Sequence, residues 1–252
     1  MTRASPTLRV VTLNIHKGLS QFNRRVVIHE LREGLRALQP DLVFLQEVQG
    51  LNHRHALRYA AWPDEGQHEF LAGDELEHAY AHNRVHQYGH YGNALLSRHP
   101  IVSFENEDVS DHRFERRGML HAVVRVPGWK RNLHCVCVHL SLHERGRRRQ
   151  LETLAARLES RVDRRQPVVI AGDFNDWRQR ASGVLERALG VTEVSSAAGG
   201  RHHRTFPSLM PVLRLDRIYV RGFRVLDSRA HRGRPWSLLS DHLALSAELA
   251  LE

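Results

Sequence analysis

The sequence contains few cysteines and few lysines, and it has no long hydrophobic run. Only 2 residues of the 252 are cysteine, Cys135 and Cys137, which lie two positions apart in a predicted strand. Such neighbours share one face of a strand, so we expect two small buried side chains. They are too few for a zinc knuckle, and a disulfide between them would be geometrically awkward. We therefore expect a reducing, cytoplasmic compartment.

The absence of long apolar runs argues against a membrane-embedded chain. No run approaches the roughly 20 apolar residues that span a bilayer. Residues 1–6 lack an apolar core of signal-peptide length, so nothing in them indicates export. A hydrophobic content of 41% with 26% charged residues is typical of a globular protein. Because no repeat, linker or compositional break appears, we expect one domain over residues 1–252, with a core at about 7–250.

Arginine supplies nearly all of the positive charge. The chain has 37 Lys+Arg against 28 Asp+Glu, a net charge of +9, and a further 19 histidines. Arginine favours bidentate binding of phosphate groups. A GC-rich genome would also write Arg in place of Lys, and the composition leaves both explanations open.

Hydrophobic periodicity predicts interleaved helices and strands. An amphipathic helix is predicted at 24–38, where Val27, Leu31 and Leu35 lie on one stripe, and a second at 144–162. Several strands are joined too tightly for parallel crossovers, so we expect an α/β fold with two packed mixed sheets and helices outside. The predicted strands are 8–13, 42–46, 93–97, 118–126, 132–139, 168–171, 214–220, 223–228 and 243–249, with a short helix at 183–189 and a short helix plus a mobile surface stretch within 50–90.

Six short polar blocks each stand at the end of an apolar run. A polar group just past a buried strand lies at the rim of a sheet, and several rims can converge on one pocket. The side chains gathered there would suit a hard metal ion and a phosphate. The blocks are Val11-Thr12-Leu13-Asn14, Leu45-Gln46-Glu47, Val138-His139-Leu140, Gly172-Asp173-Phe174-Asn175, Leu215-Asp216-Arg217 and Ser240-Asp241-His242.

Each block has chemistry to offer, although each is also compatible with an ordinary turn or cap. Ionised Asp173 can deprotonate a water, and the Asn175 amide can donate to a developing phosphorane oxygen. Asp216 can accept from one ring nitrogen of His242, which keeps the ring protonated and leaves its other nitrogen for a phosphate. The carboxylate of Glu47 is expensive to bury unless it binds a metal ion.

In their order and context, the blocks resemble the endonuclease/exonuclease/phosphatase superfamily, which includes deoxyribonuclease I. The likeness covers about residues 7–250. It implies a four-layer α/β sandwich of the deoxyribonuclease I type, and hydrolysis of a phosphodiester with Mg²⁺, or with Mn²⁺ in its place. The matching segments run from Val11-Thr12-Leu13-Asn14-Ile15-His16-Lys17-Gly18, through Asp41-Leu42-Val43-Phe44-Leu45-Gln46-Glu47 and Gly92-Asn93-Ala94-Leu95-Leu96-Ser97-Arg98, to Ser240-Asp241-His242.

The resemblance also implies a role for each site residue. Apurinic endonucleases place an acid where this chain has His16, which puts a second metal ligand and cleavage at abasic sites in doubt. Arg116 competes with Arg117 for the phosphate-contacting position. The resemblance assigns catalysis to Asp173, His242, His139, Asn175 and Asp216, metal binding to Glu47, Asn14 and Asp241, and phosphate or substrate contact to Arg117, Asn93, Asn175 and His242.

The sequence leaves the substrate open. Nucleic acid is the leading hypothesis, and the arginines at 145–149 and 201–204 are candidate anion contacts, although a solvated basic face is the favoured explanation of the first group. The alternative is a phosphodiester in a lipid headgroup or a small molecule, with Trp62, Trp177 and Trp236 as candidate apolar rim residues. A scaffold that has lost catalysis is the remote third possibility.

Overall fold

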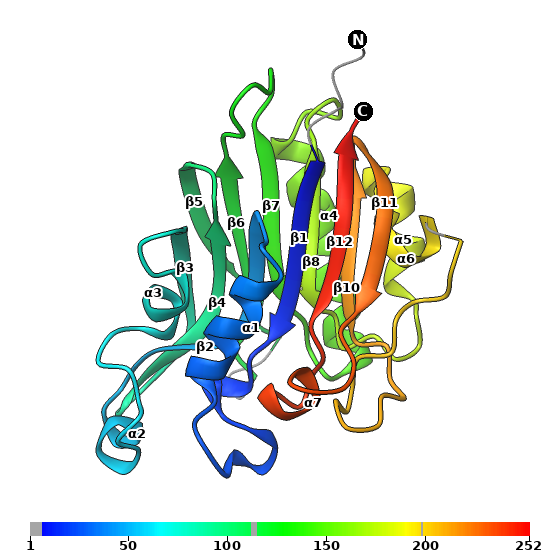
Figure 1. The fold of residues 1–252 in the computed structure, drawn as a ribbon. Coiled ribbons are helices and arrows are strands. Elements are labelled where there is room, and N and C mark those ends of the chain that lie inside the picture. Colours follow the sequence, from blue (N-terminus) through cyan, green and yellow to red (C-terminus); the bar gives the residue numbers. More distant parts are fainter. Residues whose placement is uncertain (1–6, 112–114, 198) are drawn as a thin grey trace.

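Two six-stranded β-sheets form the centre of the protein, seen in a computed structural model that describes residues 7–111, 115–197 and 199–252 (Figure 1). In each sheet one pair of strands is parallel, β1 with β2 and β7 with β8, and the remaining pairs are antiparallel. The mixed sheets expected from the sequence are therefore confirmed. The first sheet runs β11 (Phe223–Ala230), β12 (Leu245–Leu251), β1 (Thr7–Asn14), β2 (Leu42–Asn52), β4 (Gly89–Ser97), β3 (Glu77–His86). The second runs β5 (Ile101–Asp108), β6 (Gly118–Val124), β7 (Leu133–His139), β8 (Val168–Asp173), β10 (Asp216–Arg221), β9 (Thr192–Glu193).

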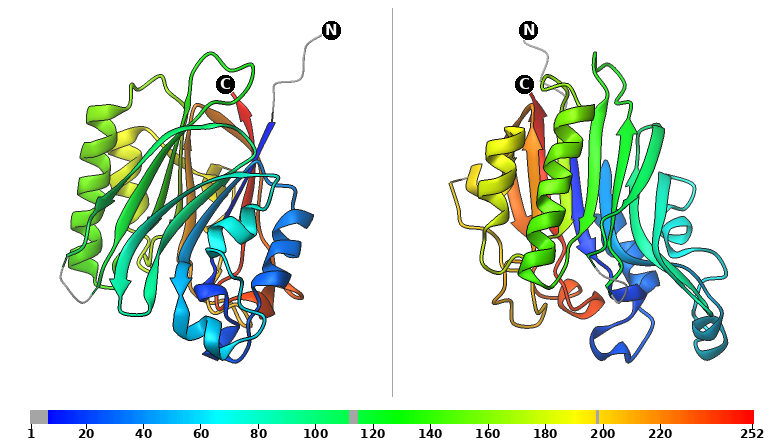
Figure 2. Two further views of the ribbon diagram at one scale, coloured as in Figure 1. Left: turned by 90° about the vertical axis from the view of Figure 1, so that its left-hand side faces the viewer. Right: turned by 180° about the vertical axis from the view of Figure 1, so that it is seen from behind.

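Three apolar clusters hold four layers together. The central cluster joins the facing sides of the two sheets, with Phe44 from the first and Val169 from the second among its fully buried members. A second cluster lies under α1 (Ile28–Ala37), α3 (Gln67–Ala72) and α7 (Trp236–Leu239), and a third under α4 (Glu144–Arg161) and α5 (Ala181–Leu189). Figure 2 shows these two groups of helices on opposite sides of the paired sheets. The four-layer α/β sandwich is thus confirmed.

The two long helices agree with the sequence prediction, except at one end. Leu151, Leu154 and Leu158 of α4 are buried as expected. Helix α1 begins four residues later than predicted, because residues 19–26 close a loop through a bridge between Leu19 and Val26. Two single-turn 3-10 helices, η1 (His16–Gly18) and η2 (Gln21–Asn23), precede that closure. The short helix expected at 183–189 is α5.

For residues 50–90 the expected short helix is confirmed, but the prediction of a surface stretch for the rest was wrong. This segment holds α2 (His53–Arg58), α3 and the whole of strand β3. Strand β3 gives a weak signal because its fully buried side chains are only alanines, Ala79 and Ala81. Strand β5 was also missed, since it is an edge strand whose Glu105 and Glu107 pair with Arg157 of α4 instead of entering the core. The short β9 and α6 (Val194–Ala197) were not predicted either.

Both cysteines are buried and free, as expected. Among the described residues, no helix is both long enough and apolar enough to cross a membrane. Residues 1–6, where no signal-peptide core was expected, lie outside the described part of the chain.

Candidate active site

Strand register places three predicted site residues side by side. Asp173, the last residue of β8, pairs with His139 of β7 on one side and with Asp216 of β10 on the other. Residues paired directly across neighbouring strands have their side chains on the same face. The preceding Gly172 has φ 147°, and a Cβ there would lie 1.9 Å from the Val138 carbonyl oxygen. Only glycine therefore allows β8 to approach β7 this closely just before the site.

Asp173 is the centre of a hydrogen-bonded cluster that crosses from one sheet to the other. Its Oδ2 accepts from Asn14 Nδ2 at 3.3 Å, and its Oδ1 accepts from the backbone N–H of Asn175 at 3.0 Å. The same Oδ2 lies 3.5 Å from His139 Nε2 and 3.8 Å from His242 Nε2. Burial raises the pKa of Asp173 above its ordinary value. A carboxylate with a raised pKa is a better acceptor for a proton near neutral pH.

Asp216 and His242 form the contact that the sequence led us to expect. Asp216 Oδ2 lies 2.9 Å from His242 Nδ1, and both side chains are buried. Burial alone would lower the pKa of His242, but the neighbouring Asp216 and Asp173 more than offset it and raise the pKa well above the ordinary value. These surroundings favour the imidazolium form of His242, whose Nε2 lies 3.8 Å from Asp173 Oδ2.

The surroundings of His139 favour the neutral ring, in contrast to those of His242. Burial lowers its pKa well below the ordinary value, and the nearby guanidinium of Arg117 lowers it further. One neutral and one charged imidazole thus lie on the same side of Asp173, within 4 Å of one carboxylate oxygen. The neutral ring can accept or relay a proton, and the charged ring can bind an anion.

Glu47 reaches the cluster because β2 is bulged at this point. The register between β2 and β4 shifts between Leu45 and Val48, and Glu47 has a positive φ of 55°. Bulges of this kind re-aim a side chain and are common beside active sites. Glu47 Oε1 accepts from Asn14 Nδ2 at 3.5 Å, and Oε2 lies 3.4 Å from Lys17 Nζ. Burial raises the pKa of Glu47, but Lys17 and neighbouring imidazoles outweigh this effect and lower it to about 2.

The donors around Glu47 fit a hard divalent cation. Glu47 Oε2 is buried and has no hydrogen-bond partner within the described residues, so its charge is balanced by the Lys17 ammonium group 3.4 Å away and its lone pairs stay available to a metal ion. Asp241 lies next to His16, with 3.3 Å between Oδ2 and Nδ1, and it shares Ser240 with Asn14: Ser240 Oγ donates to the Asn14 carbonyl oxygen at 2.6 Å. Carboxylate and amide oxygens are the ligands that Mg²⁺ prefers.

A different trio also lies close enough to hold a metal ion. Ligand atoms of Asp173, Asp216 and His242 lie within 4.8 Å of one another. We do not assign the metal to this trio, because His242 Nδ1 and Asp216 Oδ2 are already hydrogen-bonded to one another at 2.9 Å, and the raised pKa of His242 disfavours the neutral ring that a metal ion needs. Asp216 Oδ1, like Glu47 Oε2, has no hydrogen bond among the described residues.

The predicted phosphate contacts are distributed unevenly. The Arg117 guanidinium is buried beside His139 and binds Glu115 at 3.1 Å, whereas Arg116 is exposed and pairs with Asp108. Arg117 is therefore the arginine that reaches the site. The Asn93 amide instead donates to the Gly118 carbonyl between the sheets, at 2.9 Å, and no hydrogen bond among the described residues joins it to the cluster.

Asn175 also has a structural partner. Its side-chain amide donates to the Leu140 carbonyl oxygen at 2.9 Å, and its φ is 49°. This bond fixes the side chain at the end of β8 and leaves the second N–H of the amide for another acceptor.

Sequence reasoning gave no role to Lys17. The residue has φ 60° in η1 and, besides Glu47, its ammonium group lies 5.7 Å from the Tyr91 ring centroid. Its position in the Asn14–Gly18 segment, which matches the family, is the sequence signal from which its role could have been predicted. Phe206 was missed as well: its ring lies 4.9 Å from that of His242 and covers it. Aromatic residues in a loop give no pattern from which such a contact could be predicted.

Most residues of the two basic segments are engaged within the fold. Arg147 is buried and donates to backbone carbonyls of residues 141 and 142, and Arg149 pairs with Asp111. In the second segment, His202 lies 2.9 Å from Glu193 and His203 lies 3.1 Å from Ser228. The histidines of the second segment and most arginines of the first therefore have structural partners, and they do not form a continuous basic groove by themselves.

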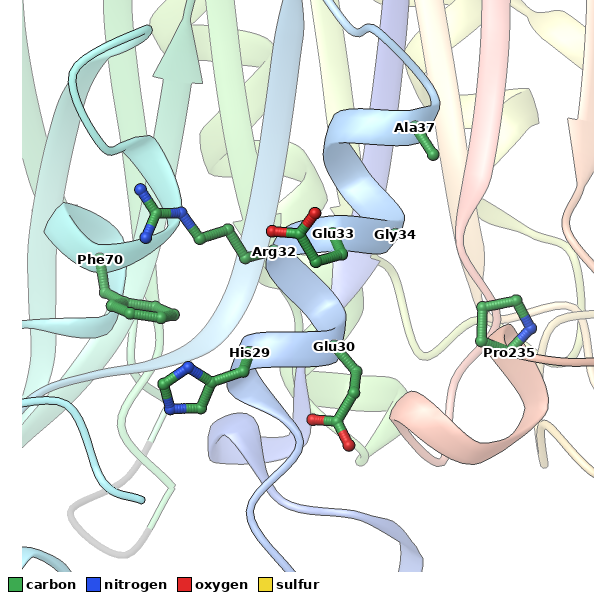
Figure 3. Close-up of a pocket in the computed structure, with 8 residues that line it drawn as sticks. All are labelled: His29, Glu30, Arg32, Glu33, Gly34, Ala37, Phe70 and Pro235. Atoms are coloured by element: carbon green, nitrogen blue, oxygen red, sulfur yellow. The ribbon is translucent and has the colours of Figure 1, made fainter. Parts of the chain in front are cut away.

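A hollow of about 560 Å³ lies elsewhere, on the outer face of α1. Figure 3 shows Phe70 and the His29 ring at one side of it and Pro235 at the other. Its charged groups, such as Glu30 and Glu33, are spread along an exposed helix face and do not converge. We therefore place the candidate active site at the ends of the strands and not in this hollow.

Comparison with known proteins assigns the family. Residues 11–242 match the model of the endonuclease/exonuclease/phosphatase family. The chain belongs to this family. Its members are metal-dependent hydrolases of phosphoester bonds. The uncharacterized protein YbhP of Escherichia coli (strain K12) is 45% identical over 246 residues, which cover 97% of each chain.

Solved structures agree on the fold. A family member from Bacteroides vulgatus superposes with a TM-score of 0.78 at 17% identity, covering 98% of this chain and 100% of that one. D. rerio TDP2, complexed with a single-strand DNA product, has a TM-score of 0.69 at 18% identity, covering 96% of this chain and 98% of that one. These likenesses concern the fold, because sequence identities this low do not show that two proteins share a substrate.

Proposed function

We propose that this protein is a divalent-metal-dependent phosphodiesterase, formed by one domain over residues 1–252, that attacks its substrate with an activated water. The observation that carries the proposal is the continuous chain of contacts from Glu47 through Asn14 and Asp173 to His242 and Asp216, which draws on both sheets. The cluster combines a buried base, Asp173, a buried cation, His242, and a carboxylate for a metal ion, Glu47. These are the parts that phosphoester hydrolysis needs.

Glu47, Asn14 and Asp241 would hold the metal ion, for which we propose Mg²⁺, with Mn²⁺ able to replace it. When bound, the ion neutralises charge on the phosphate oxygens. Asp173 orients the attacking water and takes its proton, helped by its raised pKa. The Asn175 backbone N–H and the Asn14 amide fix the orientation of the Asp173 carboxylate.

Cationic and amide groups then bind the phosphate. The His242 imidazolium, held by Asp216, and the second N–H of the Asn175 amide face the developing negative charge. Arg117, whose charge acts on His139, adds a second cation. Neutral His139 serves the leaving group as a relay: it would take up at Nε2 the proton that Asp173, 3.5 Å away, removes from water, and give up the proton on its other ring nitrogen. We propose that Asn93 contacts the substrate only through its side-chain oxygen, Oδ1, which lacks a hydrogen-bond partner among the described residues.

Two substrate classes remain for this chemistry. Nucleic acid is supported by the net charge of +9. A phosphodiester in a lipid headgroup is supported by the exposed apolar side chains at the same end of the protein as the site.

The test is a Mg²⁺- and Mn²⁺-supplemented screen with an aryl phosphodiester, plasmid DNA, RNA and phospholipid vesicles. We expect metal-dependent release of the aryl alcohol by the wild type, and its loss in Asp173→Asn. Arg116→Ala is the matched control, because Arg116 is exposed and outside the cluster. Equal turnover by wild type and Asp173→Asn would refute the mechanism.

A further inference from the structure

Exposed apolar side chains are concentrated at one end of the protein. Among the described residues, all but three of the large apolar side chains that are exposed lie at the end of the sandwich where the candidate site is. The exceptions, Val102, Phe104 and Leu226, lie on the edge strands β5 and β11. Scattered exposed apolar residues are normal, but such a one-sided concentration marks an interaction surface.

The most exposed of these side chains form tips on separate loops. Leu57 of α2 is 92% exposed, Met210 is 71% exposed and Phe22 of η2 is 70% exposed. Figures 1 and 2 show the loops and short helices that carry them projecting from the same end of the sheets. We call this group the apolar rim, defined as Phe22, Leu51, Leu57, Leu209, Met210 and Leu238.

Arginines stand among these apolar tips. The Arg24 guanidinium lies 5.3 Å from the Phe22 ring centroid, Arg54 lies 5.7 Å from that of Tyr88, and Arg58 lies 5.1 Å from that of Tyr59. Within the described residues, none of the three makes an ion pair with a carboxylate. Guanidinium groups held beside apolar tips place positive charge at the level where a bilayer has its anionic headgroups.

The type of apolar residue distinguishes a membrane from a nucleic acid. Single-stranded nucleic acids bind through aromatic side chains on which bases stack. The rim is mainly aliphatic, and Leu57, Leu209 and Met210 gain nothing from a base or a phosphate. Buried at the acyl boundary, however, each removes its apolar surface from water, which favours binding. The tryptophans considered from the sequence do not supply stacking either, because Trp62 and Trp236 are buried and only Trp177 is exposed.

We propose that this end of the protein docks reversibly on an anionic phospholipid surface. The apolar rim enters the headgroup region, the neighbouring arginines bind lipid phosphates, and the candidate site then faces the bilayer. Because no helix among the described residues can cross a membrane, attachment is peripheral. Docking goes beyond the proposed hydrolysis and does not depend on it. If both hold, the substrate is a phosphodiester in a lipid headgroup.

The experiment is flotation of the protein with vesicles of phosphatidylcholine alone and of phosphatidylcholine mixed with phosphatidylglycerol. Asp173→Asn is used as the background so that hydrolysis does not alter the vesicles. We expect binding to the mixed vesicles, weakened at least about tenfold by Leu209→Ser with Met210→Ser. The matched control is Val102→Ser with Phe104→Ser, which removes two exposed apolar side chains from β5 and should leave binding unchanged.

A far-UV circular dichroism melt of each variant shows whether it folds, and Leu57→Ser on α2 provides an independent rim variant. The proposal is overturned if the parent protein does not float with mixed vesicles, or if both rim variants bind them as tightly as the parent. It is also overturned if plasmid or single-stranded DNA is bound and the rim variants weaken only that binding. Vesicle binding without phosphodiesterase activity in the wild type would uphold docking and refute the proposed hydrolysis.

Discussion

The first sheet and the second sheet bring different chemistry to the candidate site. From the first come Asn14 of β1 and Glu47 of β2, with Asp241 in the segment that leads into β12, and Glu47 Oε2 lies beside the Lys17 ammonium group. From the second come Asp173 and Asp216, whose carboxylates are buried and hydrogen-bonded. The pKa of Glu47 is lowered to about 2, whereas that of Asp173 is raised.

This difference separates two tasks. A carboxylate that stays ionised can hold a metal ion, and one with a raised pKa can accept a proton. Asn14 links them, because its amide nitrogen lies within 3.5 Å of oxygens on both acids. The site therefore exists only where the two sheets meet, and variants on either side should fail in different ways.

The largest effect is expected on the second sheet. Asp173→Asn keeps the shape but removes the base, so kcat should fall by about 10³-fold. Stopped assays with an aryl phosphodiester at saturating Mg²⁺ measure this loss. If added Mg²⁺ restored the rate, Asp173 would belong to the metal site and the division between the sheets would be wrong.

On the first sheet, Glu47→Gln should weaken metal affinity by about 100-fold, because it replaces a charged carboxylate by a neutral amide. The activity should return as Mg²⁺ or Mn²⁺ is increased. Lys17→Met is the matched comparison: it removes the cation beside Glu47, so it should not weaken metal binding. Metal affinity unchanged in Glu47→Gln would contradict the assignment.

Asp216→Asn tests a residue that acts through His242. Losing its charge lowers the pKa of the imidazolium that Asp216 now stabilises, so we expect kcat to fall by roughly 10- to 100-fold. Thr205→Ala is a control, since Thr205 Oγ1 accepts a hydrogen bond from the backbone N–H of Asp216, at 3.4 Å, and not from its side chain. Proton NMR of the His242 ring should show that its titration moves to lower pH in Asp216→Asn. An unchanged titration would remove Asp216 from this role.

The smallest effect concerns a buried histidine of the second sheet outside the site. His121 Nε2 lies 3.0 Å from His134 Nδ1, and burial lowers the pKa of His121 to about 4. The folded protein keeps His121 neutral where the unfolded chain, with a pKa near 6.5, binds a proton. Between about pH 6.5 and 4, falling pH should therefore lower the free energy of unfolding, by up to about 3 kcal/mol.

Urea unfolding across this pH range measures that dependence, and His121→Gln should flatten it. Glu105, 3.7 Å from the ring, reduces the effect by favouring the charged form. A slope that persists unchanged in His121→Gln would assign it to other groups.

Much of the second sheet's contribution could be predicted from the sequence. Asp173 and Asp216 each stand next to an apolar run, and strand pairing then places them opposite one another. The bulge at Glu47 could not be predicted, because a positive φ inside a strand leaves no local pattern. Strands β3 and β5 escaped prediction, since the buried side chains of β3 are alanines and glutamates of β5 pair with an arginine of α4.

The resemblance to the family supplied what periodicity could not, namely that the six blocks converge. It did not indicate which of the side chains that match the family are hydrogen-bonded to the backbone, as Asn93 is to the Gly118 carbonyl. Nor did it indicate the apolar rim, which consists of loop residues that no periodic pattern marks as exposed.

The division between the sheets is tested most directly by titrating Mn²⁺ into Glu47→Gln and Asp173→Asn side by side, with free ion measured by electron paramagnetic resonance. We predict that Asp173→Asn binds Mn²⁺ as the wild type does while being inactive, and that Glu47→Gln binds it about 100-fold more weakly. Weakened binding in Asp173→Asn together with wild-type binding in Glu47→Gln would contradict the account.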